Sequence, residues 1–329
     1  LGQQRFAGAG GAYQQRALGE LGADGGVFAG IVEEVDDLLQ GLLGLILTGH
    51  VLEGDAGLLF HIHLGIGLAH VADAADAPLM IVAAGPLPDL ATGQTRMDTL
   101  RQTIAIMKAV TENIQSSGFS GIIVNISNPA DVVTHYIQTK LNWPSGRIFS
   151  TSTTLDSARL RTEISKKVGV SPKSIDAYMI GEHGFSQLAA FKAATIAGKS
   201  LNELQAENPD KYAFDHMEVE ELARKGGYVT YQGKQCTEYA VANSAARVCA
   251  AVLHNEHAVL SASTLMTGQY GEEGIFTSLP CVIGAEGVEE VYTLDLSEYE
   301  LEGFHKSCQH IRDNIAQLDW WDTEAYDAK

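Results

Sequence analysis

Cysteine is scarce in this chain of 329 residues, and no two cysteines have a metal-binding or redox spacing. The four thiols lie far apart and form no C-x-x-C pair, so neither a zinc knuckle nor a disulfide framework is indicated. This usage favours a reducing compartment, and we expect a cytoplasmic protein. The cysteines are Cys236, Cys249, Cys281 and Cys308.

Basic residues and long apolar runs are also few. The 22 Lys and Arg residues face 41 Asp and Glu residues, which leaves a formal net charge of −19. Nucleic acids and anionic membranes both attract a basic surface, so we predict neither as a partner. The apolar run 38–52 is too short for a hydrocarbon core of roughly 30 Å, and Gln40 and His50 interrupt it, so no membrane span is predicted.

Residues 1–75 lack seven residue types altogether: Lys, Ser, Asn, Pro, Cys, Met and Trp. They nevertheless hold 16 of the 34 glycines. An ordinary βα unit uses Ser, Asn and Pro at caps and turns and Lys on exposed helix faces. We therefore interpret 1–75 as an anomalous glycine-rich segment, hypothetically foreign to the rest of the chain. One helical spacing survives there, through Phe28, Ile31, Val35, Leu38 and Leu42.

After this segment the pattern predicts a parallel α/β sheet. Apolar runs at 78–84 and 121–126 predict buried strands, and 147–151 predicts a shorter one. A helical stripe through Leu100, Ile104, Met107, Val110 or Thr111, and Ile114 separates the first two strands. A helix begins at Leu155. Strands that alternate with helices are typical of parallel sheets.

The C-terminal half predicts an α+β domain. Short strands are expected at 177–180 and 188–195, and helices around 217–223 and over 238–253. Residues 301–318 place apolar side chains at alternating spacings of three and four, which predicts an amphipathic closing helix.

The string Gly181-Glu182-His183-Gly184 follows an apolar strand and is the first candidate for chemistry. A single histidine is usually a surface or core residue, and the prior for catalysis is roughly one in ten. Asp156 and Arg159, three apart at the start of a helix, would by themselves indicate an ordinary intrahelical ion pair. Their combination with the histidine string favours an active site.

Three motifs resemble, in order and spacing, the lactate/malate dehydrogenase family. They are Ser-Asn-Pro-Ala-Asp around Asn128-Pro129, the run 155–159 and the string 181–184, and the resemblance covers about residues 74–318. Strings at 118–121, 186–187, 223–228 and 237–242 look closest to the L-2-hydroxyisocaproate and L-lactate dehydrogenase branch.

The resemblance implies an incomplete or atypical Rossmann-type parallel sheet followed by an α+β substrate domain. Residues 1–75 would stand in place of the first half of the dinucleotide-binding domain, 76–151 would form its remaining half, and 152–329 the catalytic domain. It also implies NAD as cofactor, a small 2-keto or 2-hydroxy monocarboxylic acid as substrate, and a homo-oligomer.

By the same resemblance, four residues act on the substrate. His183 would donate the proton to the keto oxygen, because an imidazolium is a suitable acid near neutral pH, and Asp156 would orient it. Arg96 would polarise the carbonyl. Arg159 would hold the carboxylate with two parallel hydrogen bonds, which a lysine cannot do.

Five further residues are expected to line the ligand sites. Asn128 ends a strand at the carboxyl edge of the sheet and would hold the substrate carbonyl or the nicotinamide. Ala84 and Gly85 would contact the cofactor. Thr237 would line the substrate wall and Val241 the nicotinamide wall.

The sequence departs from the family pattern in several places. No Gly-x-Gly-x-x-Gly follows a first strand; Gly8-x-Gly10 and Gly65-x-Gly67 only approach it. Ser150 and Ser152 stand where the family has glycines, and Phe185 stands where it has a polar residue. Histidines 61, 63 and 70 lack a nearby acid or thiol ligand, so no metal is predicted.

Two other function classes are weighed. The alternative is a non-catalytic or chimeric chain that retains the substrate domain without a competent NAD site, and NADH titration separates it from a dehydrogenase. An NAD- and metal-dependent glycosidase would need Cys and His ligands that are not convincingly placed.

The loop after the first predicted strand indicates the substrate class. Residues 86–95 contain no Lys or Arg to neutralise a second carboxylate, and Leu87 and Leu90 make the loop apolar. We predict faster turnover of pyruvate or 2-ketoisocaproate than of oxaloacetate, measured as kcat/KM with NADH. A preference for oxaloacetate would contradict this expectation.

Overall fold

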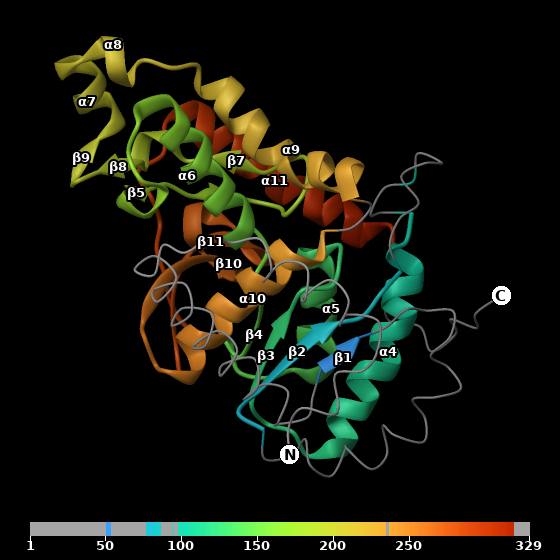
Figure 1. Ribbon diagram of the computed structural model, residues 1–329. Helices are drawn as coiled ribbons and strands as arrows, with labels where there is room; N and C mark the ends of the chain where they lie inside the picture. Colours follow the sequence, from blue (N-terminus) through green and yellow to red (C-terminus); the bar gives the residue numbers. More distant parts are fainter. Residues whose placement is uncertain (1–50, 54–76, 87–93, 95–97, 235–236, 319–329) are drawn as a thin grey trace, which may run out of the picture. The chain divides into compact units, whose positions relative to one another are not determined.

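The computed structural model describes residues 51–53, 77–86, 94, 98–234 and 237–318 (Figure 1). Several features predicted above lie outside them: the helical spacing of 28–42, the Gly8 and Gly65 strings, the three N-terminal histidines, Leu87, Leu90, Arg96 and Cys236.

A seven-stranded mixed sheet organises the described part of the chain, in the order β1-β2-β3-β4-β10-β11-β12. The first four strands are parallel. Their near-continuous apolar sequences suit strands that are covered on both faces. The predicted α/β class is confirmed. These strands are β1 (Val51–Glu53), β2 (Leu79–Ala83), β3 (Ile122–Asn125) and β4 (Ile148–Ser150).

Alternate residues of the parallel strands pack into two different cores, because successive side chains of a strand point to opposite faces. Met80 and Ile123 pack with α4 (Leu100–Ser117) and α5 (Ala130–Leu141). Leu79 and Phe149 pack on the other face with α10 (Glu238–Leu253). Helix layers therefore cover both faces of the sheet (Figure 1).

Helix α4 follows the predicted stripe and resolves its one ambiguity. Thr111 is buried, whereas Val110 is only partly so, and the Thr111 hydroxyl donates to the Met107 carbonyl oxygen at 2.9 Å. The helix ends at Gly118, whose left-handed backbone (φ 75°) suits a residue without a Cβ.

The antiparallel half of the sheet was not predicted from the sequence. β4 pairs in parallel with β3 and in antiparallel with β10, at Ser150 and Ser263, so it joins the two halves. Buried Ser and Thr residues interrupt the apolar pattern of β10, which hides its strand character. The three strands are β10 (Ala258–Thr267), β11 (Glu273–Gly284) and β12 (Gly287–Val291).

Most of the remaining elements form the α+β part around a separate core, in which α6 packs against α9; α11 instead packs against β7, β11 and α5. The strand predicted at 188–195 was wrong as one element, because a 3-10 turn at Phe191–Ala193 divides it into β7 and β8. The predicted strand at 177–180 is confined to β6. The elements are α6 (Thr154–Val168), β5 (Ile175–Asp176), β6 (Met179–Ile180), β7 (Leu188–Ala189), β8 (Thr195–Ile196), β9 (Lys199–Ser200), α7 (Leu201–Glu207), α8 (Pro209–Tyr212), α9 (His216–Lys234) and α11 (Glu298–Ala316).

Truncating Phe149 should test how tightly β4 is packed in the core. Phe149 is 0% exposed, so Phe149→Ala should lower the free energy of unfolding by about 3–5 kcal/mol. Val259→Ala on β10, at a side chain 41% exposed, should change it by less than about 1 kcal/mol. Urea denaturation measures both; equal effects would show that Phe149 is not part of a tightly packed core.

Candidate active site

The first turn of α6 is tied to two strands that are distant in sequence. The Thr153 hydroxyl donates to the Met179 carbonyl oxygen at 2.7 Å and lies 2.7 Å from the Ser261 hydroxyl on β10. The Ser157 hydroxyl accepts the Met179 N–H at 2.9 Å. These contacts hold the helix start beneath the loop that follows β6, and they bury Asp156.

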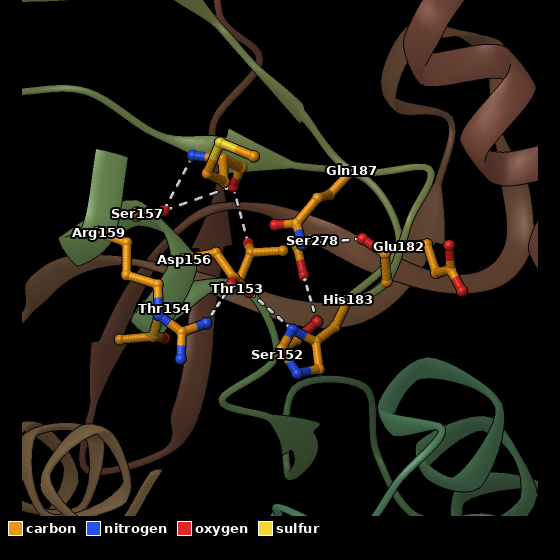
Figure 2. A network of polar contacts seen from close by, with 12 residues as sticks. Ser152, Thr153, Thr154, Asp156, Ser157, Arg159, Glu182, His183, Gln187 and Ser278 are labelled. Carbon is orange, nitrogen blue, oxygen red and sulfur yellow. Dashed lines mark hydrogen bonds and ion pairs between the residues drawn. The ribbon is translucent and has the colours of Figure 1, made fainter. Parts of the chain in front are cut away.

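Asp156 shares its carboxylate between the two other residues that the sequence analysis singled out. One oxygen lies 2.7 Å from His183 Nδ1, and the other accepts from the Arg159 guanidinium at 2.9 Å (Figure 2). The side chains of Asp156, His183 and Arg159 are 1%, 13% and 18% exposed. A carboxylate buried this deeply requires such partners, since an unpaired buried charge is strongly unfavourable.

The loop of His183 is held by the backbone of β11 and by α11. Gly181 exchanges two backbone hydrogen bonds with Ser278, at 3.0 and 3.1 Å. Gly181 has φ 89°, and a Cβ there would lie 2.6 Å from the Ser307 Oγ. The Glu182 N–H donates to that same hydroxyl at 2.8 Å. Glycine at 181 is thus required by both the backbone conformation and the close approach of α11.

Asp131 is a second buried carboxyl beside His183, and the sequence analysis did not single it out. Its Oδ2 accepts the His183 backbone N–H at 2.8 Å, and its Oδ1 accepts the Ser152 hydroxyl at 3.2 Å. Burial raises the pKa of Asp131 to about 6, although the His183 amide bond opposes the shift. Its place in the Ser-Asn-Pro-Ala-Asp string, in the first turn of α5, was the available indication.

Two glycines of α9 make room for Arg159. A Cβ on Gly226 would lie 2.9 Å from the Arg159 Cδ, and one on Gly227 would lie 3.5 Å from its terminal nitrogens. Glycines inside a helix reduce its stability relative to alanine. The absent side chain of Gly226 lets the arginine lie against the helix, whereas a Cβ at Gly227 would be at ordinary contact distance. Beside them, Tyr228 stacks on Phe185 with ring centroids 5.2 Å apart.

A cavity at the carboxyl ends of β3 and β4 brings together Asn128, His183 and Val241 from three separate segments. Asn128 Oδ1 is buried in the described structure without a hydrogen-bond partner. A buried acceptor of this kind suits a ligand that brings its own N–H donor. The lining residues are Ile126, Asn128, Ala130, Ser150, Thr151, Ser152, Leu155, His183, Val241 and Ser244.

Five predicted residues that the structure describes do not appear in this lining: Asp156 and Arg159, whose contacts are given above, and Thr237, Ala84 and Gly85. Thr237 is the residue before α10 and makes no side-chain cap bond. The Ala84 N–H donates to the Ser127 hydroxyl at 2.8 Å, at the carboxyl end of β2. Gly85 follows with φ 145°, and a Cβ there would lie 3.1 Å from the Thr103 hydroxyl oxygen. Arg96 lies outside the described residues.

Among the described residues, His, Cys, Asp and Glu form no group of three or more that could hold a metal ion. In the same part of the chain, no helix combines the length and apolar character needed to cross a membrane.

The site joins a cavity at the carboxyl ends of parallel strands to a His–Asp pair and an arginine from the α+β part, an arrangement suited to proton transfer on an anionic substrate. Residues 47–150 match the model of the lactate/malate dehydrogenase NAD binding domain, and residues 153–319 match that of the α/β C-terminal domain. The chain belongs to the lactate/malate dehydrogenase family. The N-terminal match includes β1, which pairs with β2.

Individual relatives support the same family assignment. The chain is 37% identical over 247 residues to L-lactate dehydrogenase 3 of Bacillus cereus, covering 75% of this chain and 78% of the relative. It is 33% identical over 246 residues to an L-lactate dehydrogenase of Lactococcus lactis subsp. cremoris, with the same coverage. The crystal structure of the minor L-lactate dehydrogenase from Enterococcus mundtii, in the ligands-bound form, superposes with a TM-score of 0.70 at 32% identity, covering 75% and 78% of the two chains.

The raised pKa of Asp131 predicts a specific pH dependence of stability. Between pH about 4 and about 6 the unfolded chain releases this proton while the folded protein keeps it, so stability falls as pH rises through this window. The free energy of unfolding of the wild type should therefore decline relative to that of Asp131→Asn from pH 4 to 6 and then stay level. Urea titrations at several pH values measure the difference; a difference independent of pH would contradict the assignment.

Proposed function

We propose that this chain is an NAD-dependent L-2-hydroxy-acid dehydrogenase that catalyses reversible hydride transfer between NADH and a 2-keto monocarboxylic acid of the lactate or L-2-hydroxyisocaproate type. The observation that carries the proposal is the buried Asp156 carboxylate, shared between His183 and Arg159 beside a cavity lined by His183. The relatives named above do not favour a non-catalytic chain.

His183 is the proposed proton donor to the keto oxygen. Its Nδ1 faces Asp156 at 2.7 Å, which leaves Nε2 as the ring atom for proton exchange with the substrate. The carboxylate stabilises the protonated ring and holds its orientation. In the reverse direction the same atom accepts the proton from the hydroxy acid.

Arg159 is the proposed anchor for the substrate carboxylate. A guanidinium can form two parallel hydrogen bonds with a carboxylate, which sets both the position and the rotation of the substrate. Its ion pair with Asp156 and its packing on Gly226 limit the rotamers of the arginine. Arg96 is proposed to polarise the carbonyl, and Thr237 to border the substrate.

The residues at the cavity fit the nicotinamide end of the cofactor. The unpartnered Asn128 Oδ1 suits the N–H of a carboxamide, and Val241 offers an apolar wall. Bound NADH would supply the hydride. Ala84 and Gly85, at the carboxyl end of β2, are proposed to contact the cofactor, because ligands of doubly wound folds bind at that edge.

The organisation and setting of the protein are part of the proposal. Residues 1–75 are proposed as an anomalous segment, 76–151 as the remaining Rossmann half and 152–329 as the catalytic domain; the family match begins inside the first segment, at residue 47. A cytoplasmic location is proposed because the cysteines within the described residues, Cys249, Cys281 and Cys308, are buried free thiols. A homo-oligomer is proposed from the family resemblance.

Steady-state kinetics with NADH and pyruvate or 2-ketoisocaproate test the function. His183→Gln should lower kcat by about 10²- to 10⁴-fold, since a general acid contributes about that much. Arg159→Lys should raise the KM for the keto acid more than about tenfold, because the bidentate contact is lost. Arg247→Lys, at an exposed pair with Glu256, is the matched control and should leave both constants unchanged.

The non-catalytic alternative has a distinct outcome. If the folded wild-type chain neither changes NADH fluorescence on titration nor reduces a 2-keto acid, the proposed function is wrong for this chain.

A further inference from the structure

Ser152 has a backbone conformation that an L-residue rarely adopts. It lies in the turn between β4 and α6 with φ 33°, in the left-handed region, and its side chain is buried. Glycine would relax this backbone, and the family that the chain resembles has glycine here. A serine in this position therefore needs a compensating role for its side chain.

The Ser152 hydroxyl lies between two buried groups. It accepts from the Ser278 hydroxyl of β11 at 2.7 Å and donates to Asp131 Oδ1 at 3.2 Å. The other Asp131 oxygen accepts the His183 backbone N–H at 2.8 Å. A continuous chain of hydrogen bonds thus runs from Ser278 through Ser152 and Asp131 to His183, and Figure 2 shows its start at Ser278 and Ser152.

His183 is consequently held at two points by two different carboxyl groups. Asp156 contacts the ring at Nδ1, and Asp131 contacts the backbone N–H. The bonds of Gly181 and Glu182 to β11 and α11 hold the residues before His183, but the ring contact by itself does not fix the backbone at His183. The second contact, on the backbone, does fix it, and proton transfer requires reacting atoms to be placed within fractions of an ångström.

We propose that Ser152 and Asp131 are positioning residues that fix the His183 backbone. The imidazole then already has the orientation needed for proton transfer when the substrate binds. This inference rests on the proposed dehydrogenase function. The Ser152 hydroxyl orients the Asp131 carboxylate, and the carboxylate holds the His183 amide in place.

Several neighbouring groups influence the charge of Asp131. Burial raises the pKa of Asp131, the neighbouring Ser263 and the His183 backbone amide lower it, and the Glu182 carboxylate raises it again. The Cys308 thiol of α11 also interacts with this carboxyl. Hydrogen bonds to the carboxylate favour its ionised form.

Two substitutions at one position separate the hydroxyl from the backbone. Ser152→Ala removes the hydroxyl and keeps the strained backbone, and Ser152→Gly removes the hydroxyl and relaxes the backbone. We expect both to increase the hydrogen exchange rate of the His183 amide and to lower kcat, each about tenfold, with the keto-acid KM within about twofold. Thr111→Ala, which deletes a buried hydroxyl bonded inside α4, is the control and should change neither.

Variants of Asp131 test the next contact in the chain. Asp131→Asn keeps an oxygen that can accept the His183 N–H, so amide exchange should stay near the wild-type rate. In Asp131→Ala the His183 amide should exchange faster than in either Ser152 variant, because the acceptor of its hydrogen bond is gone.

Three results would overturn the proposal. They are wild-type behaviour of Ser152→Gly, a Thr111→Ala effect equal to that of Ser152→Ala, and unchanged amide exchange in Asp131→Ala. Should the wild type have no dehydrogenase activity, the proposed function fails separately, while the exchange rates still decide whether Ser152 and Asp131 hold the loop.

Discussion

The buried carboxylate of Asp156 is the constraint on which the rest of the site depends. An ionised carboxyl that is 1% exposed must be paired on both oxygens, and here His183 and Arg159 supply the pairing. The same two contacts fix the imidazole and the guanidinium relative to each other. Pairing one buried charge therefore holds a proton donor that lines the cavity, His183, and a guanidinium, Arg159, on the same carboxylate.

Placing that carboxylate requires the whole central sheet. β4 joins the parallel strands to β10, and β10 supplies Ser261 to the start of α6. β11 bonds to Gly181 and, through Ser278, to the turn that contains Ser152. The antiparallel strands thus hold the two sides of the site together, while the parallel strands form the edge where the cavity lies.

Much of the secondary structure follows from sequence patterns alone. The helix over 238–253 has the predicted bounds, because its ends and its periodic small apolar residues are local features. β10 could not be predicted in the same way. Its buried Ser261, Ser263 and Thr264 break the apolar alternation, and Ser261 becomes favourable in the core only through partners on α6 and β6. The 3-10 turn inside 188–195 is likewise hidden by an apolar run.

The sequence by itself determined which reactive groups are available. Short sequence motifs identify the His183 loop, the spacing of Asp156 and Arg159, and Asn128 at the end of a strand. The tertiary structure alone decided which groups meet. Asp131 lies 52 residues from the amide it accepts, and Ser278 lies 126 residues from the hydroxyl it donates to. Such pairings depend on burial, because a polar group removed from water bonds whichever partner the fold brings within reach, and no local pattern encodes that partner.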